Sequence, residues 1–307
     1  MVIVVTGGAG FIGSHIVDAA VSRGDKVVVI DNFATGKMEN VNPSAVLCRM
    51  DIRDKEVDGV FAEHHPDAVI HEAAQVNLRY SVDDPVYDAD VNILGTINLL
   101  QSCIRHGVKK FVFASSGGAV YGEQEVFPAP DGHPTRPMSP YGIAKLTIEH
   151  YLYYYSITYG LDYTALRYSN VYGPRQDPYG EAGVVAIFAE KMLKGETPVI
   201  NGDGGQTRDY VYVGDVVRAN MLALDGSYTG TLNAGTGVEA SVNELFDTLK
   251  SETGFKGERV HGPAKLGEQR RSVIDHSLFR EKLGWDPTVS LEEGLKHTVE
   301  FFRGKRA

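Results

Sequence analysis

Short unbroken runs of apolar residues recur along the first half of the chain, and a segment with helical periodicity follows each of them. Runs such as VIVV, VVVI and FVF show no polar alternation, which is typical of strands covered by helices on both faces. Repeated strand–helix units with right-handed crossovers build a doubly wound parallel sheet, so we expect an α/β fold. The predicted strands are Val2–Thr6, Lys26–Ile30, Ala45–Arg49, Ala68–His71, Lys110–Ala114 and Tyr163–Arg167.

This rhythm breaks after about residue 172, where loops rich in glycine and proline begin. The segments GPRQDPYGEAG and GETPVINGDGGQTRDY separate short, scattered elements, which predicts a smaller C-terminal lobe interleaved with the sheet domain. We expect residues 1–170 to form the sheet domain, part of 210–235 to return to it, and 171–307 to form mainly a substrate-binding lobe.

The charge balance argues against polyanionic partners. Lys and Arg number 30 against 40 Asp and Glu, and the net charge of −10 has the wrong sign for a binder of nucleic acid or anionic membranes, unless one face is locally basic. Cys48 and Cys103 have no CxxC spacing and nothing nearby completes a zinc site, so we expect buried thiols and no metal. No apolar run reaches 18 residues and the N-terminus lacks a basic leader, which favours a cytoplasmic protein without a membrane segment.

The string TGGAGFIGSH follows the first predicted strand and opens the first helix. Its glycines, among them Gly7, Gly10 and Gly13, let the backbone turn sharply and approach a pyrophosphate at the helix N-terminus, although a tight structural turn reads the same way. The next strand leads to Asp31, 18 residues after Gly13 (31 − 13), where an acid would bind ribose and repel a 2′-phosphate. Because no Arg occurs at 32–36, the pattern predicts a Rossmann fold that binds NAD rather than NADP.

Three further segments fall where this cofactor would lie. Asp51 and Ile52 follow the third strand and could face the adenine. The small residues of His71–Gln75 end the fourth strand and allow a phosphate or ribose to approach closely. Asn92 in DVNILGT begins a helix, and we expect either a cofactor contact, a helix cap or a polar link between strands.

The segment SPYGIAK predicts a catalytic pair. Ser139 suits an N-cap and Pro140 the first helical position, which places Tyr141 and Lys145 four residues apart on one helix face. The same spacing also occurs in surface pairs that have no catalytic role. In a catalytic site, the ammonium and a cationic nicotinamide would lower the pKa of the phenol and make it a base. Ser115 and Ser116 end the fifth strand, where a hydroxyl could hold the reacting substrate oxygen or simply cap a turn.

Together these segments resemble the extended short-chain dehydrogenase/reductase family, and within it most closely the UDP-glucose 4-epimerases. The resemblance spans the chain through TGGAGFIGS, DN at 31–32, HEAAQ, FASSGGAVYG, SPYGIAK, RYSNVYGP, NGDGGQTRDYVYVGDVV, NAGTG, GEQRRSVID and LGWDP. It implies NAD as cofactor, a UDP-sugar as substrate, and a redox-neutral 4-epimerisation through a 4-keto sugar with Tyr141 as the acid and base.

The resemblance also implies a role for each matching position. Asn170 would hold a substrate phosphate, Val184 would contact substrate through its backbone, and Arg208 with one of Arg270 or Arg271, here Arg271, would neutralise the diphosphate. The cofactor contacts would be Gly7, Gly10, Phe11 and Ile12 at the pyrophosphate, Asp31 and Asn32 at the ribose, Asp51 and Ile52 at the adenine, Ala73, Ala74, Gln75, Asn92 and Ser115 along the cofactor, Tyr141 and Lys145 at the nicotinamide ribose, and Tyr168 and Val171 beside the nicotinamide.

The serine loop departs from the family pattern by one residue. Alignment from the strand places the catalytic hydroxyl at Ser116, whereas alignment from Tyr121 places Gly117 there; we choose Ser116, with Ser115 second. Dehydratases of the family carry an acid directly after this residue, and Gly117-Gly118-Ala119 carries none, which favours epimerisation over elimination. Ser169 stands where the family usually has Phe, with no clear consequence.

Substrate size and assembly follow from the same resemblance. Counting from Gly267-Glu268 places the small Ser272 where a bulky residue would block N-acetylated sugars, so we expect activity on UDP-N-acetylglucosamine as well as UDP-glucose. Tyr151, Tyr155 and Tyr159 form an i+4 stripe that, with the helix around Ile93–His106, resembles a four-helix homodimer interface. The alternatives are a UDP-glucuronate epimerase, a 4-keto-sugar reductase, or a non-catalytic binder of NAD or nucleotide sugars.

Overall fold

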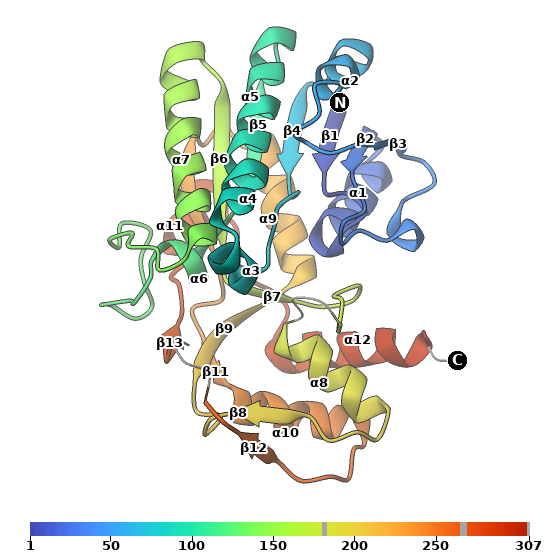
Figure 1. The fold of residues 1–307 in the computed structure, drawn as a ribbon, viewed down its shortest axis with the longest axis vertical. Helices are drawn as coiled ribbons and strands as arrows, with labels where there is room; N and C mark the ends of the chain where they lie inside the picture. The colour runs from blue at the N-terminus through green and yellow to red at the C-terminus, as the bar shows by residue number, and fades with distance from the viewer. Residues whose placement is uncertain (180–182, 265–268, 306–307) are drawn as a thin grey trace.

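The computed structural model describes residues 1–179, 183–264 and 269–305. Seven strands form one sheet in the order β3-β2-β1-β4-β5-β6-β10, and every pair is parallel (Figure 1). The unbroken apolar runs are buried on both faces, as predicted, and the strand ends differ from the predicted ones by at most two residues. The strands are β1 (Val2–Thr6), β2 (Lys26–Asp31), β3 (Val46–Arg49), β4 (Ala68–His71), β5 (Lys110–Ser116), β6 (Asp162–Tyr168) and β10 (Gly230–Ala234).

Helices cover both faces of this sheet, which confirms the doubly wound fold. On one face, Ile16 and Val216 pack in one core with Val5; on the other, Leu100 and Leu152 pack with Phe111. Figure 1 shows α5 and α7 running side by side over the second face. The first face carries α1 (Phe11–Arg23), α9 (Val213–Asp225) and α11 (Ser277–Leu283), and the second carries α2 (Val57–His64), α5 (Gly95–His106) and α7 (Pro140–Tyr159).

The helix before β5 is longer than predicted. α4 (Pro85–Ala89) runs through a π-helical segment, Asp90–Leu94, directly into α5. Asn92 therefore lies inside a helix, and the expectation that it begins one is wrong. A π-helical turn inserted into an α-helix often marks a functional site. The remaining short helices are η1 (Met38–Asn40), α3 (Leu78–Asp83) and α6 (Gly117–Val120).

The second lobe has its own core and small sheets, and it lies beyond one end of the large sheet in Figure 1. Phe188, Phe246 and Leu295 meet in this core, one from each of three helices. β9 (Thr207–Tyr212) pairs with β7 (Asn170–Tyr172), β11 (Glu239–Ser241) and β13 (Arg271–Ser272). The other elements are β8 (Val199–Asn201), β12 (Val260–Gly262), α8 (Val184–Leu193), α10 (Val242–Thr253) and α12 (Leu291–Gly304).

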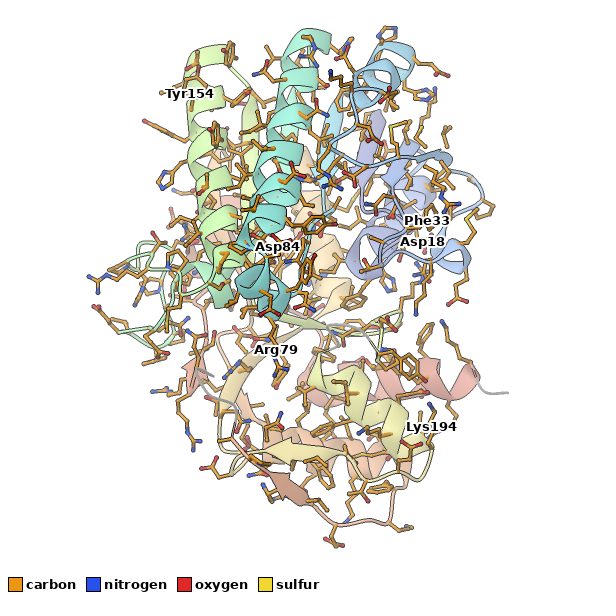
Figure 2. The ribbon with its side chains drawn as sticks, viewed as in Figure 1. Asp18, Phe33, Arg79, Asp84, Tyr154 and Lys194 are labelled. Atoms are coloured by element: carbon orange, nitrogen blue, oxygen red, sulfur yellow. The ribbon has the colours of Figure 1, made fainter. Side chains whose placement is uncertain are left out.

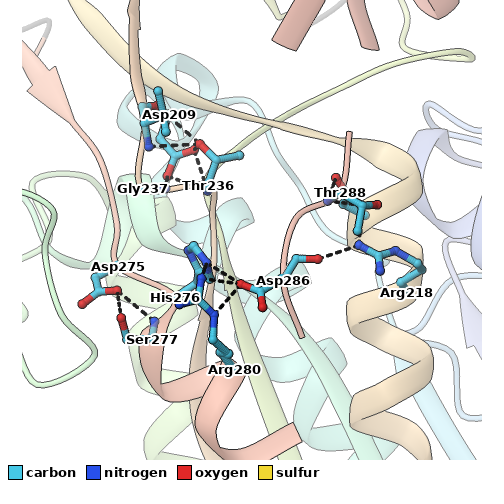
Figure 3. Close-up of polar contacts among 12 residues, drawn as sticks. Asp209, Arg218, Thr236, Gly237, Asp275, His276, Ser277, Arg280, Asp286 and Thr288 are labelled. Atoms are coloured by element: carbon cyan, nitrogen blue, oxygen red, sulfur yellow. Dashed lines mark hydrogen bonds and ion pairs between the residues drawn. The ribbon is translucent and has the colours of Figure 1, made fainter. Parts of the chain in front are cut away.

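The two lobes are interleaved along the chain. β10 returns to the large sheet beside β6, and the chain returns again later, because Phe279 and Trp285 pack in the same core as β1. The carboxylate of Asp209 in β9 links the lobes by accepting hydrogen bonds from the Thr236 amide (2.9 Å) and hydroxyl (2.7 Å), just after β10 (Figure 3). Among the described helices, none combines the length and apolar character needed to cross a membrane.

Candidate active site

A cavity of about 670 Å³ lies at the carboxyl ends of β1, β2 and β4. The strand order reverses between β1 and β4, and ligands bind at this position in doubly wound sheets. Most of the predicted cofactor residues lie together on its wall: Gly7, Gly10, Phe11, Ile12, Asp31, Asn32, Asp51, Ile52, Ala73, Ala74, Gln75 and Val171.

The glycine loop is packed too tightly for side chains. Gly7 has a φ of +69°, and a Cβ there would lie 2.7 Å from the amide nitrogen of Ala73. A Cβ on Gly13 would lie 2.2 Å from the carbonyl oxygen of Gly7. α1 begins directly after this loop with no side-chain cap and no acid in its first turn. Its first amide groups can therefore bind a pyrophosphate, and the loop fits the dinucleotide that the sequence predicts.

The opposite end of the cavity is acidic. Asp31 is buried and accepts hydrogen bonds from the amides of Ala9 (2.9 Å) and Phe33 (2.8 Å), which anchors the glycine loop to β2. Asn32 donates to Asp51 at 2.8 Å, and hydrogen bonds from Arg53 lower the pKa of Asp51 to about 2. Two carboxylates at this end suit the free hydroxyls of NAD and disfavour the phosphate of NADP.

Asn92 lies behind the cavity wall rather than on it. Its amide group accepts a hydrogen bond from the Gln75 nitrogen (2.8 Å), donates one to the Gln75 oxygen (2.9 Å), and donates another to Asp88 (3.0 Å). These contacts tie the loop after β4 to the π-helical segment. The structure thus favours the polar-link interpretation of Asn92, and a direct cofactor contact stays a prediction.

The Tyr141–Lys145 pair lies beneath the end of β5. The Lys145 ammonium donates a 2.7 Å hydrogen bond to the Ala114 oxygen and lies 5.7 Å from the centre of the Tyr141 ring. Desolvation lowers the pKa of Lys145 to about 8. Desolvation, with the nearby carboxylates of Asp88 and Glu72, raises the pKa of Tyr141 above its ordinary value. The prediction that the ammonium and a cationic nicotinamide together lower the phenol's pKa concerns the protein with its cofactor bound, and it stays a prediction.

The two serines at the end of β5 have different surroundings. The Ser115 hydroxyl is buried and donates a 2.6 Å hydrogen bond to Glu149, which also forms a buried ion pair with Arg167. Ser116 precedes α6, is only partly buried, and makes no capping hydrogen bond. Ser116 is therefore the better placed of the two to bind a substrate oxygen.

The predicted substrate residues meet on one face of the small sheet. Arg208 and Ser272 are register partners in β9 and β13, and Asn170 is the partner of Tyr210, two residues along β9. Since residues two apart on a strand share a face, Asn170, Arg208 and Ser272 point to the same side. A Cβ on Gly118 would lie 3.9 Å from the Ser272 hydroxyl, so this side meets the short helix α6 that follows β5.

Two predicted substrate residues stand apart from this group. Arg271 is the register partner of Thr207, forms an ion pair with Glu239 (2.7 Å), and lies over the Phe127 ring at 3.9 Å. It therefore points to the opposite face from Arg208, and its diphosphate contact stays a prediction. Val184 opens α8. The pair at 267–268, from which the position of Ser272 is counted, lies outside the described residues.

Among the residues that the sequence analysis missed, Glu72 and Arg175 also line the cavity. Tyr168 donates a 2.8 Å hydrogen bond to Glu72. Arg175 has a φ of +68° and pairs with Asp18 of α1 at 2.7 Å, which draws the loop after β7 toward the glycine loop. The sequence offered one signal for Glu72, because it is the charged residue among the small ones of HEAAQ. It offered none for Arg175, which only the tertiary packing brings to the cavity.

Known proteins similar to this chain share its whole length. A UDP-glucose 4-epimerase from Thermotoga maritima, solved with UDP-glucose, is 53% identical, with a TM-score of 0.98 and full coverage of both chains. A UDP-glucose 4-epimerase from Thermus thermophilus, solved with NAD, is 50% identical, with a TM-score of 0.94 and 99% of each chain covered. A UDP-glucose 4-epimerase from Mycolicibacterium smegmatis is 45% identical, with 98% of each chain covered.

The model of the NAD dependent epimerase/dehydratase family matches residues 3–235, which is more than half of the chain. This match confirms the predicted family and its cofactor, and the cavity described above fits that cofactor. The chain belongs to the NAD-dependent epimerase/dehydratase family.

Proposed function

We propose that this chain is an NAD-dependent UDP-hexose 4-epimerase that interconverts UDP-glucose and UDP-galactose. The observation that carries the proposal is the position of the Tyr141–Lys145 pair. The charge of Glu72, on the wall of the cofactor cavity, acts on both residues, and their helix α7 packs against α6, whose Gly118 faces Ser272. The first residues of α6, Gly117-Gly118-Ala119, offer no acid for elimination of a water molecule. The names of the similar proteins support the same reaction.

Each residue of the site has a defined task in this reaction. Tyr141 takes the proton of the sugar 4-hydroxyl and later returns it, so that no net proton is consumed. Ser116 donates a hydrogen bond to the same sugar oxygen and keeps it beside the phenol. Lys145, fixed by the Ala114 oxygen, supplies positive charge below the ring. When bound, NAD supplies a reversible hydride acceptor for C4, and the 4-keto sugar must turn over before the hydride returns.

The direct test is incubation of the purified protein with UDP-galactose and no added reductant. We expect UDP-glucose to accumulate to an equilibrium without net change in reduced cofactor. A 4-keto-sugar reductase consumes NADH in proportion to product and would therefore form no UDP-glucose in this mixture, and a non-catalytic binder would also leave UDP-galactose unchanged. The matched control is Tyr141→Phe, which keeps the ring but removes the proton-transferring hydroxyl and is expected to form no product.

We also propose that the substrate range includes N-acetylated UDP-hexoses. Ser272 is small, buried, and directed at the hydrogen-only position of Gly118, which leaves room on the sugar side. Ser272→Tyr is expected to abolish turnover of UDP-N-acetylglucosamine while UDP-glucose is still converted. Equal losses of turnover for both sugars in Ser272→Tyr would contradict this assignment. So would a wild-type protein that converts UDP-glucose but not UDP-N-acetylglucosamine.

A homodimer is proposed from the exposed apolar residues of neighbouring helices. Tyr154 is 45% exposed and Ile157 66% exposed on α7, and Val86 and Leu94 are 78% and 58% exposed before α5. Figure 2 shows Tyr154 toward the outer end of α7. Tyr155 of the predicted stripe is buried within the chain's own core instead, because it packs with α5. Light scattering should give twice the chain mass; a monomer at all concentrations would contradict the dimer.

The domain boundaries and the location in the cell complete the proposal. We retain 1–170 and 171–307 as the approximate domains, with part of 210–235 shared; the packing of β10 on β6 supports that sharing. Cytoplasmic location is supported by two free cysteines, Cys48 and the buried Cys103, because a reducing compartment keeps thiols in the reduced form.

A further inference from the structure

Glu72 is a carboxylate in the centre of the site with no role in the mechanism above. It follows β4 directly and forms part of the wall of the cofactor cavity, beside the small residues Ala73 and Ala74. Its charge acts on both members of the catalytic pair, Tyr141 and Lys145. The carboxylate therefore lies where the inner end of the cavity meets the reacting groups.

A hydrogen-bonded chain holds Glu72 in place from the other face of the sheet. Asn220 of α9 donates to the Tyr168 hydroxyl at 2.7 Å, and Tyr168 donates to Oε1 of Glu72 at 2.8 Å. Asn220 and Tyr168 are buried, so the chain is rigid and shielded from solvent. The second carboxylate oxygen, Oε2, has no hydrogen-bond partner among the residues that the structure describes.

The surrounding charges explain why an acid is useful at this position. Lys145 is a buried ammonium, and its ordinary ionisation is opposed by desolvation. Three titratable groups interact with the Glu72 carboxylate: Tyr168 from β6 by a hydrogen bond, and Lys145 and Tyr141 from α7 through their charges. Asp88 from α4 is a second acid whose charge acts on Lys145. Desolvation raises the pKa of Glu72 to about 7, so entry of a further cation shifts the group toward its ionised form.

We propose that Glu72 is the counter-charge of the catalytic centre, whose carboxylate stabilises the cationic, oxidised nicotinamide relative to the neutral, reduced one. The inference rests on the proposed function, because it assumes that the nicotinamide lies beside Tyr168 and Val171. Glu72 thereby sets how readily the bound cofactor accepts a hydride. If the bound cofactor were too strong an oxidant, it would keep the hydride and the keto sugar would not be reduced again. The carboxylate of Glu72 opposes that outcome.

The test is the reduction potential of the bound cofactor in the purified holoenzyme, measured by absorbance of the reduced nicotinamide against a couple of known potential. Glu72→Gln keeps the shape and the oxygen that accepts from Tyr168, but removes the charge. We expect the ratio of NADH to NAD⁺ affinities to rise about tenfold or more, since two charges a few ångströms apart interact strongly in a desolvated site. About tenfold corresponds to a potential about 30 mV more positive.

Two further variants separate charge from structure. Glu72→Asp keeps the charge with a shorter side chain, and its potential should stay near that of the wild type. Asp177→Asn removes a different acid from the cavity wall, one paired with Lys37, and should change both affinities by the same factor. If a variant is isolated without cofactor, separate titrations with NAD⁺ and NADH give the same ratio.

An unchanged potential in Glu72→Gln would overturn the proposal, as would equal shifts in Glu72→Gln and Glu72→Asp. Both results concern the cofactor alone and need no sugar. Failure of the epimerase assignment would appear separately, as absence of UDP-hexose interconversion in the wild-type protein whose potential still responds to Glu72.

Discussion

Replacement of each serine at the end of β5 by alanine should have opposite consequences. Ser116 makes no capping hydrogen bond and is partly buried, so Ser116→Ala should leave the free energy of unfolding within about 0.5 kcal/mol of the wild type. Its hydroxyl is assigned to the substrate oxygen, so turnover should fall roughly 10²-fold, which corresponds to about 2.7 kcal/mol of transition-state stabilisation.

Ser115→Ala removes a buried 2.6 Å hydrogen bond from Glu149, whose ion pair with Arg167 remains. The loss of one donor to a buried carboxylate should cost about 1–3 kcal/mol of stability, while turnover at temperatures where the variant stays folded should remain near that of the wild type. Urea unfolding and initial rates of UDP-glucose formation measure the two effects. Near wild-type turnover in Ser116→Ala, or a greater loss of turnover in Ser115→Ala, would refute the assignment.

Two further predictions concern the lysine and the glycine loop. In the cofactor-free protein, Lys145 has a folded pKa of about 8, below the unfolded value of about 10.4, so its side chain binds more protons in the unfolded state between these values and its contribution to stability should rise with pH there. Lys145→Met should lose that slope in urea unfolding at several pH values, and an unchanged slope would show that another group causes it. Gly13→Ala forces the glycine loop apart, because its Cβ would lie 2.2 Å from the Gly7 oxygen. The substitution should lower the free energy of unfolding by about 1–3 kcal/mol and leave the protein without bound cofactor. Cofactor released on denaturation measures this, and a full complement of NAD in Gly13→Ala would contradict the role of the loop.

The sheet and the cofactor loop were predictable because local patterns determine them. Strands buried on both faces must be apolar throughout, and a helix that starts at a pyrophosphate needs glycines at fixed spacing. Phe279 and Trp285 show the limit of such patterns. They return to the core of β1 late in the chain, and nothing in the local periodicity of residues 277–287 indicates which core they join.

The electrostatics of the site were less predictable than its residues. The interpretation of Ser115 changes because Glu149, 34 residues away, accepts its hydrogen bond. The pKa of Tyr141 is raised because the phenol is desolvated and two carboxylates act on it. Both effects arise from the folded surroundings, which motif spacing does not describe.

The most direct measurement of the central claim follows deuterium placed at C4 of UDP-galactose during conversion by the wild-type protein. An epimerase that returns the same hydride after the keto sugar turns over should produce UDP-glucose with the deuterium still at C4, even in the presence of excess unlabelled NADH. Loss of the deuterium to solvent or to the added cofactor, or conversion that stops when NADH is exhausted, would contradict epimerisation at this site.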